Sequence, residues 1–518
     1  PPPAPGKLST LTRRLPLANL ETTQGLKRVL GPANLVALGV GATIGAGLFS
    51  LTGIAASENA GPAVVLSFLV AAIACGFAGL CYSELSSMIP IAGSAYTYAY
   101  VTLGELMAWI IGWDLVLEYA VGAATVAVSW SRYVVSLLDS WGIVLPPRLT
   151  ASPFETLHMA DGSVTHGIAN LPAALAICGV SWVLIRGISQ SAMVNAVIVT
   201  IKLLVIAAFI GFGIAYINPA NYHPFLPPND GTFGHFGLSG VMRAAGTIFF
   251  AYVGFDAVST TAQETRNPAR NMPIGILGSL LVCTLVYVAF ATVMTGLVNY
   301  RDMVGDAAPV ATAINRTPYH WLQTAVKIGI ICGFTSVLLG MLLGQSRVFF
   351  AMSRDGLLPR LFSITHPRYQ TPWLSNLFFM GLTCLLSAFL PISELGHMTS
   401  IGTLLAFVLV CAGVMALRRT APDTPRPFKV PGGDIIPVLG VLSCGSVMIF
   451  LDQMTWLRLV VWRAIGMVIY VAYGRTHSRL AHAKPDHPAP HASAHAVHLH
   501  PEGHYCRHAL TPFQPRAA

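Results

Sequence analysis

The sequence predicts an all-α membrane protein, on the evidence of its composition and of its apolar pattern. Of the 518 residues, 54% are hydrophobic and only 10% are charged, whereas about a quarter of the residues in a soluble globular domain are charged. Twelve apolar runs approach the length of about 20 residues that a helix needs to cross a bilayer. Nucleic-acid binding is not expected, because no basic stripe with interleaved aromatic residues accompanies the net charge of +9.

The predicted membrane helices follow one another along most of the chain. They lie near residues 34–57, 63–89, 105–136, 170–186, 191–217, 238–262, 274–298, 322–348, 373–390, 395–417, 434–452 and 455–474. We expect three regions: a cytoplasmic N-terminal segment (1–33), a transmembrane domain (34–475) and a disordered His-rich cytoplasmic tail (476–518). Metal binding by the tail histidines is an open alternative, but without a fixed ligand spacing we predict no metal site.

The distribution of basic residues predicts the orientation in the membrane. An even number of crossings puts both termini on one side, and the loops on that side carry most of the Lys and Arg residues. Both ends are therefore expected in the cytoplasm of a multi-pass protein of the plasma membrane. The N-terminal segment lacks the apolar core of a signal peptide, so the first membrane helix is expected to be retained. The cysteines of the apolar runs are interpreted as small buried hydrophobic residues without disulfides.

The stretch LGVGATIGAGLF, residues 38–49, has four glycines in an apolar run. A phosphate-binding loop would require a preceding strand and a βαβ unit, for which the flanking membrane sequence leaves no room. The spacing of Gly41 and Gly45 suits close contact between membrane helices, and this interpretation stays open. We favour an interrupted helix, because each glycine weakens helix continuity by about 1 kcal/mol relative to alanine. Unwound backbone is tolerated in a bilayer only around a protein-buried cavity, and its free N–H groups suit a carboxylate.

A partner interruption is expected in a second, inverted half of the chain. The sixth apolar run supplies one in GTIFFAYVGFDAVSTTAQE, where Gly246 and Gly254 bracket residues 249–252 and Asp256 lies within the apolar span. Helices 1 and 6 cross the membrane in opposite directions because they are five apart. This pattern predicts two inverted five-helix repeats, helices 1–5 and 6–10, followed by helices 11 and 12.

Three long motifs then resemble a known family. They are LKRVLGPANLVALGVGATIGAGLF, the region from SENAGPAVVLSF to VAVSWS, and FFAYVGFDAVSTTAQETRNPARNMP. They resemble the cationic amino acid transporter branch of the amino acid-polyamine-organocation superfamily. The likeness runs from about residue 26 to residue 360 and excludes both tails. It implies a leucine-transporter-type fold with broken helices 1 and 6, and transport of an amino acid.

The resemblance also implies which residues bind the substrate. The carboxylate would be held, largely by backbone N–H groups, at Thr43, Ile44, Gly45, Ala46 and Gly47. The ammonium would meet free carbonyl groups at Phe250, Ala251 and Val253. Phe250 would also close over the substrate as a gate, although packing in the core or against lipid is an alternative for Phe250 and for Phe249. Met341 would shorten the pocket and favour small neutral amino acids over arginine.

Lys202 is the most informative charged residue, because a lysine in the middle of a membrane helix costs about 2.5–3.5 kcal/mol. Its alternative is a structural lysine that extends to the membrane surface. By resemblance its ammonium replaces a sodium ion between helix 1 and helix 8, where Thr335 and Ser336 match the sodium-binding oxygens. Glu118, one turn beyond Asp114, would join a polar network near the substrate and this lysine. A plain ion pair across helices is the alternative for both carboxylates.

Two further carboxylates are expected at the cytoplasmic side. Glu84 and Glu264 would close an inner gate by pairing with Arg266, Arg270 or Arg354, and simple solvation is the alternative. Asp256 is expected to anchor helix 6 rather than to touch the substrate.

The expected function is secondary active transport, as a proton-coupled symporter of small neutral and/or cationic amino acids that works by alternating access. An obligate amino acid exchanger and, in another class, a transporter-like amino acid sensor are the alternatives. An enzyme is not expected, because no His residue outside the tail clusters with acidic partners within the helices. The expected partners are the amino acid, protons and the bilayer, with no cofactor. A small membrane-protein partner stays open.

Overall fold

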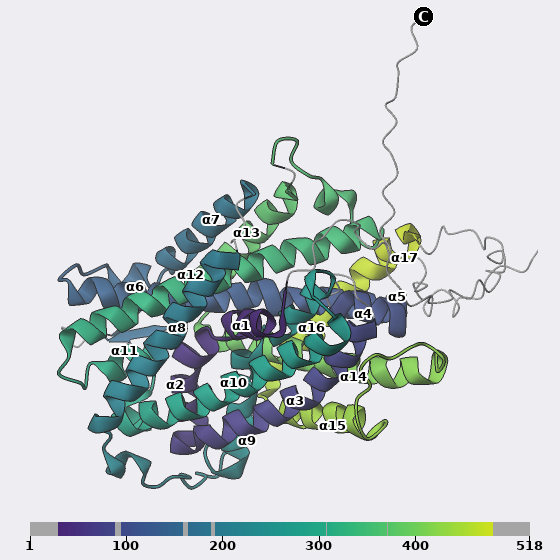
Figure 1. The fold of residues 1–518 in the computed structure, drawn as a ribbon. Helices are drawn as coiled ribbons and strands as arrows, with labels where there is room; N and C mark the ends of the chain where they lie inside the picture. Colours follow the sequence, from purple (N-terminus) through teal and green to yellow (C-terminus); the bar gives the residue numbers. More distant parts are fainter. Residues whose placement is uncertain are drawn as a thin grey trace, which may run out of the picture. The chain divides into compact units, whose positions relative to one another are not determined.

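The computed structural model describes residues 30–88, 95–158, 164–187, 192–306, 308–369 and 371–479 (Figure 1). These residues belong to one compact unit, Pro1–Ala481, and the second unit, His482–Ala518, lies outside the described residues. The tail from residue 480 and the N-terminal segment up to residue 29 also lie outside them. The predicted division into three regions therefore stays a prediction.

Helices make up most of the described chain. Those of the first half are α1 (Pro32–Thr43), α2 (Thr52–Ala55), α3 (Val64–Met88), α4 (Ala95–Thr102), α5 (Glu105–Val116), α6 (Gly122–Ser140), α7 (Leu171–Ile185), α8 (Ala192–Gly213) and α9 (Gly237–Ile248). Those of the second half are α10 (Pro268–Leu297), α11 (Pro309–Ile314), α12 (His320–Arg354), α13 (Trp373–Phe389), α14 (Ile392–Thr420), α15 (Ile435–Phe450), α16 (Gln453–Ile469) and α17 (Arg475–His477).

The prediction of a helical membrane protein is confirmed. Among the described residues, eight helical segments are long and apolar enough to cross a membrane, namely Gly47–Met88, Glu105–Ser140, Ala196–Tyr216, Gly237–Ser259, Pro268–Leu297, His320–Arg354, Ile392–Thr420 and Gln453–His477. The apolar helices α1, α7, α13 and α15 are shorter. Each of these segments overlaps a predicted run, but twelve crossings and the inverted repeat stay predictions.

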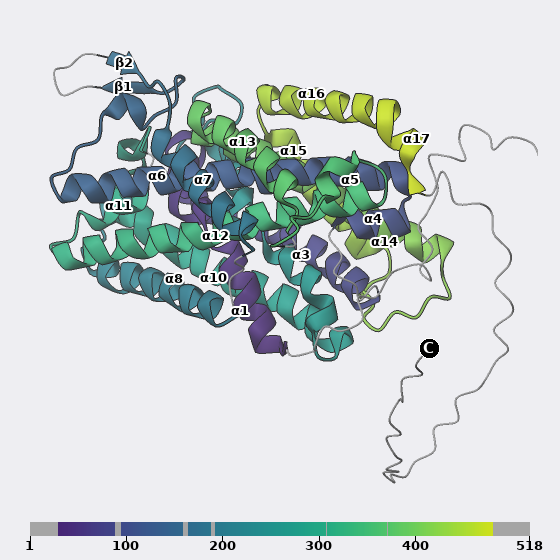
Figure 2. The same ribbon diagram turned by 90° about the horizontal axis from the view of Figure 1, so that it is seen from above.

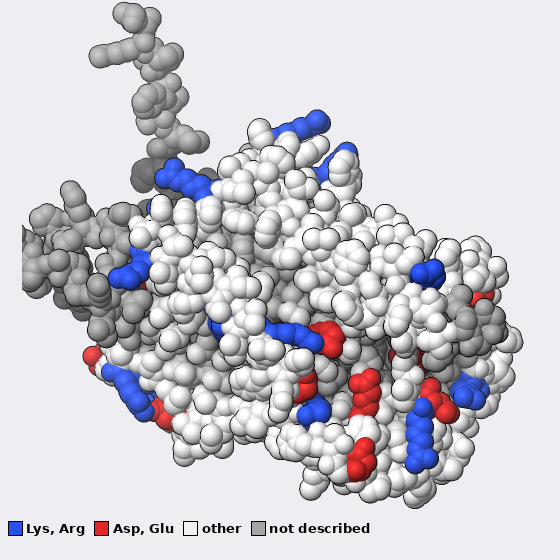
Figure 3. Space-filling view, turned by 180° about the vertical axis from the view of Figure 1, so that it is seen from behind, with Lys and Arg blue, Asp and Glu red and all other residues white. Residues whose placement is uncertain are grey.

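The outer surface of the helices is apolar. Leu175, Leu204, Leu281 and Val468 are each more than 60% exposed, and most of the face in Figure 3 carries no charged residue. Exposed apolar area on this scale is uncommon in soluble monomers. It suits contact with lipid, in which helices satisfy their backbone hydrogen bonds internally.

Helix α1 begins at the edge of the unit, where its first residues are exposed, and its last turn is buried inside the unit. It packs against α8, α10 and α12, and α10 also packs against α3 (Figures 1 and 2). The end of α1 is therefore surrounded by protein, which is the condition for an interruption of the helix within a membrane.

A short β-hairpin was not predicted. Strands β1 (Thr156–His158) and β2 (Val164–His166) pair antiparallel between α6 and α7, with Leu157 opposite Thr165 (Figure 2). An ion pair between Arg132 of α6 and Glu155 holds the start of the hairpin. Strands of three residues are too short to give the apolar alternation by which strands are predicted.

Candidate functional site

The first interruption lies at the end of α1. Ile44 follows α1 with an extended backbone (φ −73°, ψ 110°), and the N–H groups of Leu48 and Phe49 then both donate to the carbonyl oxygen of Gly45 at 3.2 Å. The first N–H groups of a helical segment have no partner within the helix. The amides of Gly45, Ala46 and Gly47 occupy this position. The interruption predicted from the glycines is therefore present.

The second interruption follows α9. A 3₁₀ turn, Phe249–Tyr252, leads to Val253 with an extended backbone (φ −61°, ψ 130°) and then to Gly254 with a φ of 115°. Only glycine adopts this left-handed conformation readily. The chain continues as a 3₁₀ helix, Phe255–Glu264, so α-helical bonding stops at the predicted place.

The two interruptions touch each other through glycines. A Cβ atom added to Gly47 would overlap the Cα atom of Ala251, and one added to Gly254 would lie 2.7 Å from the carbonyl oxygen of Ala42. Only residues without a side chain allow this approach, so the backbones of the two interrupted segments are in direct contact. Gly45 has another neighbour, because its Cβ would meet the side chain of Val337 on α12 at 3.5 Å.

The carbonyl groups of the second interruption differ from the expectation. The Tyr287 hydroxyl of α10 donates to the carbonyl oxygen of Ala251 at 2.7 Å, and the Val253 N–H donates to that of Phe250 at 3.2 Å. The predicted carbonyls of Phe250 and Ala251 are thus not free, although a carbonyl oxygen accepts two hydrogen bonds. The sequence analysis did not identify Tyr287. A tyrosine in an apolar run could have indicated this contact, because a buried tyrosine hydroxyl needs a hydrogen-bond partner.

Lys202 connects α8 to the first interruption. Its ammonium donates to the carbonyl oxygens of Gly41 at 2.8 Å and Ile44 at 3.1 Å, and the side chain is 2% exposed. Its Cε atom also lies 3.0 Å from the Cβ that Gly333 of α12 would have. The lysine therefore lies between α1 and α12, as the resemblance implied. An ammonium suits the carboxyl-terminal end of a helix, where carbonyl groups lack partners.

The two predicted hydroxyl groups of α12 have different surroundings. Ser336 is buried and donates to the Gly333 carbonyl oxygen at 2.9 Å, so it lies one turn from the lysine contact. Thr335 is exposed, donates to the carbonyl oxygen of Ile331 and accepts a hydrogen bond from the Trp130 indole at 3.1 Å. The expectation that Thr335 belongs to the surroundings of Lys202 is corrected, because adjacent helical residues point about 100° apart.

Phe250 and Met341 meet across one small space. A Cβ atom added to Gly122 of α6 would lie 3.4 Å from the Phe250 ring, from the Met341 sulfur and from the Thr399 methyl group. Phe250 and Met341 are 3% and 8% exposed, so both are buried beside the second interruption. Phe249 instead packs against Phe407 of α14 with ring centroids 5.7 Å apart, which fits the core-packing alternative for that residue.

Glu118 lies in a π-helical turn, Leu117–Val121, between α5 and α6. Its carboxyl group is buried and lies beside that of Asp256 of the second interruption, and the Oε1 atom of Glu118 and the Oδ1 atom of Asp256 have no hydrogen-bond partner among the described residues. Two carboxyl groups this close can share a proton, since a protonated carboxyl group donates a hydrogen bond and a carboxylate accepts one. Glu118 is thus linked to Asp256, whereas its predicted network extended to Lys202.

Asp114 has a partner that the sequence did not suggest. Its carboxylate forms an ion pair with the guanidinium of Arg463 on α16, and Arg463 also donates to the carbonyl oxygen of Ile110 at 3.0 Å. The indoles of Trp113 and Trp462 stack at 4.5 Å beside this pair. Figure 2 shows α16 along one flank of the unit. The position of Arg463 within an apolar helix could have indicated in the sequence that this residue needs a buried partner.

The predicted inner-gate pairs need a correction. Glu84 accepts hydrogen bonds from Arg418 at 2.5 and 3.1 Å and from the Val430 N–H at 2.8 Å, and Arg426 lies 3.5 Å away. These partners come from the end of α14 and the loop after it, not from Arg266, Arg270 or Arg354. The loop folds over Glu84 and supplies the hydrogen-bond donors and positive charges that its buried carboxylate needs. The side chain of Glu264 lies outside the described residues, so its gating role stays a prediction.

Comparisons of the sequence with known proteins identify relatives of this chain. A family model described as amino acid permease matches residues 30–471. The chain is 45% identical over 459 residues to the branched-chain amino acid permease BcaP of Bacillus subtilis, covering 88% of this chain and 95% of that protein. It is 41% identical to the methylthioribose transporter of the same organism, covering 91% and 100%. It is 36% identical to human cationic amino acid transporter 4, covering 80% and 64%. These relatives are permeases and transporters, not enzymes.

Proposed function

Because the chain belongs to the amino acid permease family, we propose that it is a proton-coupled symporter that moves amino acids across the plasma membrane by alternating access. The observation that carries this proposal is the contact between the two interruptions, in which Gly47 meets the backbone of Ala251. Small neutral amino acids are the proposed substrates, with cationic ones less favoured.

A free amino acid matches the polar groups that the interruptions offer. The amides of Gly45, Ala46 and Gly47 stand at the amino-terminal end of a helical segment, where an anion is stabilised. The second lone pairs of the Phe250 and Ala251 carbonyls supply acceptors for an ammonium. The two ends of a zwitterion would thus be bound by backbone groups of two different segments, and Phe250 would cover the side chain.

Proton coupling is proposed for two clusters of buried polar residues, one around Lys202 and one formed by Glu118 and Asp256. The ammonium of Lys202 holds the carbonyls at the end of α1, so loss of its proton would remove the positive charge, weaken that contact and make it easier for α1 to move. Ser336 would assist there. The neighbouring carboxyl groups of Glu118 and Asp256 provide a second place at which a proton can be held, next to the second interruption. Both clusters contact an interrupted segment, which is how a proton can bias the opening of either side.

The proposed orientation has both termini in the cytoplasm and twelve crossings, with helices 1–5 and 6–10 as inverted repeats. The excess of Lys and Arg in alternate loops supports it. In this arrangement the two interruptions lie near mid-membrane, where transporters with broken helices bind their substrates.

Met341 supports the preference for small neutral substrates. The Met341 sulfur and the Phe250 ring both lie 3.4 Å from the position that a Cβ atom of Gly122 would take. Little space therefore remains between them for a long substrate side chain. The similarity to a branched-chain amino acid permease favours neutral substrates, and the similarity to a methylthioribose transporter makes that sugar a second candidate. Methylthioribose has no carboxylate or ammonium, so it would leave the backbone groups of both interruptions without their ionic partners.

Counterflow in proteoliposomes tests the proposal. Purified protein is reconstituted into liposomes that contain unlabelled substrate. The uptake of labelled alanine, isoleucine, arginine and methylthioribose is then compared with and without a proton gradient directed into the liposomes, that is, with the outside more acidic. We expect the neutral amino acids to exchange into the loaded liposomes without a gradient, and to accumulate in liposomes without internal substrate only when the gradient is imposed. Exchange without gradient-driven accumulation would favour the obligate exchanger. Specific binding of an amino acid without movement of any label would favour a sensor, and uptake of methylthioribose alone would replace the proposed substrate class.

A further inference from the structure

Two cysteines of helices far apart in the sequence face each other. The sulfur atoms of Cys178 on α7 and Cys384 on α13 are 3.5 Å apart, and the residues are 206 positions apart. Both are free thiols, Cys178 exposed and Cys384 half-buried. The Cys384 thiol also contacts the Ala174 carbonyl oxygen at 3.4 Å. The pair lies outside the residues proposed for transport.

The register of α7 against α13 is fixed at both ends. At one end the Asn170 N–H donates to the carbonyl oxygen of Ala388 at 2.9 Å. At the other end the Thr371 hydroxyl donates to that of Ile185 at 2.8 Å. The two helices therefore run antiparallel and cannot slide past each other without loss of one of these bonds. The cysteines between them stay aligned.

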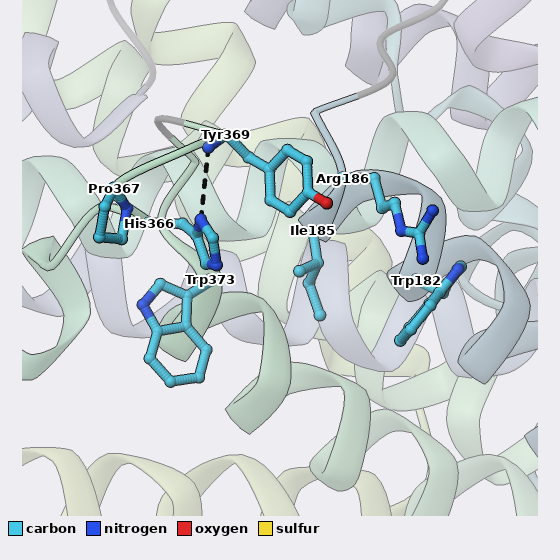
Figure 4. Close-up of a pocket in the computed structure, with 7 residues that line it drawn as sticks. All are labelled: Trp182, Ile185, Arg186, His366, Pro367, Tyr369 and Trp373. Atoms are coloured by element: carbon cyan, nitrogen blue, oxygen red, sulfur yellow. Dashed lines mark hydrogen bonds between the residues drawn. The ribbon is translucent and has the colours of Figure 1, made fainter.

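At the carboxyl-terminal end of α7, the segment that precedes α13 lies beside the helix. An open pocket of about 360 Å³ lies between the end of α7 and the segment before α13, and it is lined by Trp182, Ile185, Arg186, His366, Pro367, Tyr369 and Trp373 (Figure 4). The Arg186 guanidinium lies over the Trp182 ring, 4.7 Å from its centroid. The His366 imidazole accepts a hydrogen bond from the Tyr369 N–H at 3.3 Å. The hydrogen bond from Thr371 to Ile185 and the pocket that both segments line place this segment beside the end of α7.

We propose that Cys178 and Cys384 are a redox-responsive thiol pair that closes to a disulfide between α7 and α13. A disulfide requires sulfur atoms about 2.05 Å apart, so the two sulfur atoms have to approach each other from 3.5 Å by rotation of their side chains. The exposed side of α7 faces lipid in a membrane-spanning chain, where a charged thiolate is costly. The oxidant is therefore a membrane-permeant two-electron acceptor of the diazene or quinone class.

The reaction is balanced with such an acceptor. Two S–H bonds break and one S–S bond forms, so that the thiols lose two protons and two electrons. A diazene takes up both, and its N=N bond becomes an HN–NH single bond. The disulfide would join segments that are already in register and would therefore add a constraint chiefly to the unfolded chain.

Oxidation of the purified full-length protein with diamide, a membrane-permeant diazene, tests the inference. Remaining thiols are alkylated, and disulfide-linked peptides are identified by mass spectrometry, with Cys178→Ser, Cys384→Ser and, as a matched control, Cys332→Ser on α12. We expect a Cys178–Cys384 link in the parent and in the control, lost in the other two variants and reversed by dithiothreitol. Absence of this link in the parent would overturn the proposal.

Thermal unfolding provides a second measurement that does not depend on transport. The oxidised parent and the Cys332→Ser control should have a higher Tm than their reduced forms, whereas Cys178→Ser and Cys384→Ser should show no such rise. A link that leaves Tm unchanged or lowers it would contradict the fixed register on which the inference rests.

Discussion

The ammonium of Lys202 lies 3.1 Å from the carbonyl oxygen of Ile44, the residue at which α1 is interrupted. If this contact couples protons to transport, Lys202→Ala should abolish accumulation driven by a pH gradient while some exchange remains. The expected loss of accumulation is about tenfold or more, which corresponds to about 1.4 kcal/mol or more. Uptake of labelled substrate into proteoliposomes, with and without the gradient, measures it.

A second buried lysine provides the matched control. Lys327 of α12 is 3% exposed and donates to the carbonyl oxygen of Ser136 at 3.2 Å, away from both interruptions. Lys327→Ala removes a buried ammonium of the same kind and should keep gradient-driven accumulation. Undiminished accumulation by Lys202→Ala would disprove the coupling role of Lys202.

Gly47 allows the backbones of the two interruptions to touch, because an added Cβ atom would overlap Ala251. The Cα atom of Ala251 cannot move aside as a flexible side chain would, so Gly47→Ala should abolish counterflow. Gly179→Ala on α7 is the control, since a Cβ there meets no atom within 4 Å, and alanine is the better helix former by about 1 kcal/mol. Normal counterflow in Gly47→Ala would mean that the contact is not needed for transport.

The main features of the site were predictable because they depend on local sequence. Glycines in an apolar run give the interruptions at Ile44 and Val253, and an isolated lysine in a membrane helix requires partners, which the carbonyls of Gly41 and Ile44 provide. That Ser336 rather than Thr335 lies near Lys202 was not predictable, because the rotation of α12 about its axis decides which of the two residues faces the lysine.

Long-range partners were the main failure of prediction. Arg463 and Asp114 are 349 positions apart, and nothing in either segment identifies the other. Glu84 was expected to pair with arginines of other loops, but the loop after α14 brings Arg418 and Arg426 to it. Charge and depth in the membrane predict that such groups need a partner, and only the packing of the helices decides which one.

Met341 limits the space beside Phe250, so Met341→Ala should increase the uptake of larger amino acids relative to alanine. One extra or missing methylene group in an apolar pocket changes discrimination by about 10- to 200-fold. Competition of unlabelled isoleucine and arginine against labelled alanine measures this shift. Met454→Ala on α16, where the side chain is 59% exposed, should leave the ranking unchanged. An unchanged ranking in Met341→Ala would remove Met341 from the pocket.

The buried carboxyl groups of Glu118 and Asp256 lie side by side and can share one proton. Glu118→Gln keeps a donor for Asp256 but removes the site at which that proton is exchanged, so the structure should persist while the response of uptake to external pH is lost. Asp423→Asn, in the exposed loop after α14, is the control and should respond to pH as the parent does. Parent-like pH dependence in Glu118→Gln would exclude this carboxyl group from coupling.

Asp114 and Arg463 form a buried ion pair that attaches α16 to α5. Arg463→Met would leave the carboxylate of Asp114, which is 1% exposed, without its counter-charge. The expected loss is about 3–5 kcal/mol of stability, because removing one partner of a buried pair leaves an uncompensated charge. The double variant Asp114→Leu with Arg463→Met removes both charges and should recover most of the loss.

The ion pair between Arg458 and Glu394 is the matched comparison on the same helix. Its side chains are 33% and 37% exposed, and exposed pairs contribute only about 0–1 kcal/mol. Arg458→Met should therefore shift the unfolding midpoint in detergent far less than Arg463→Met does. Equal shifts for the two arginine variants, or no recovery in the double variant, would mean that Arg463 stabilises α16 by packing rather than by its charge.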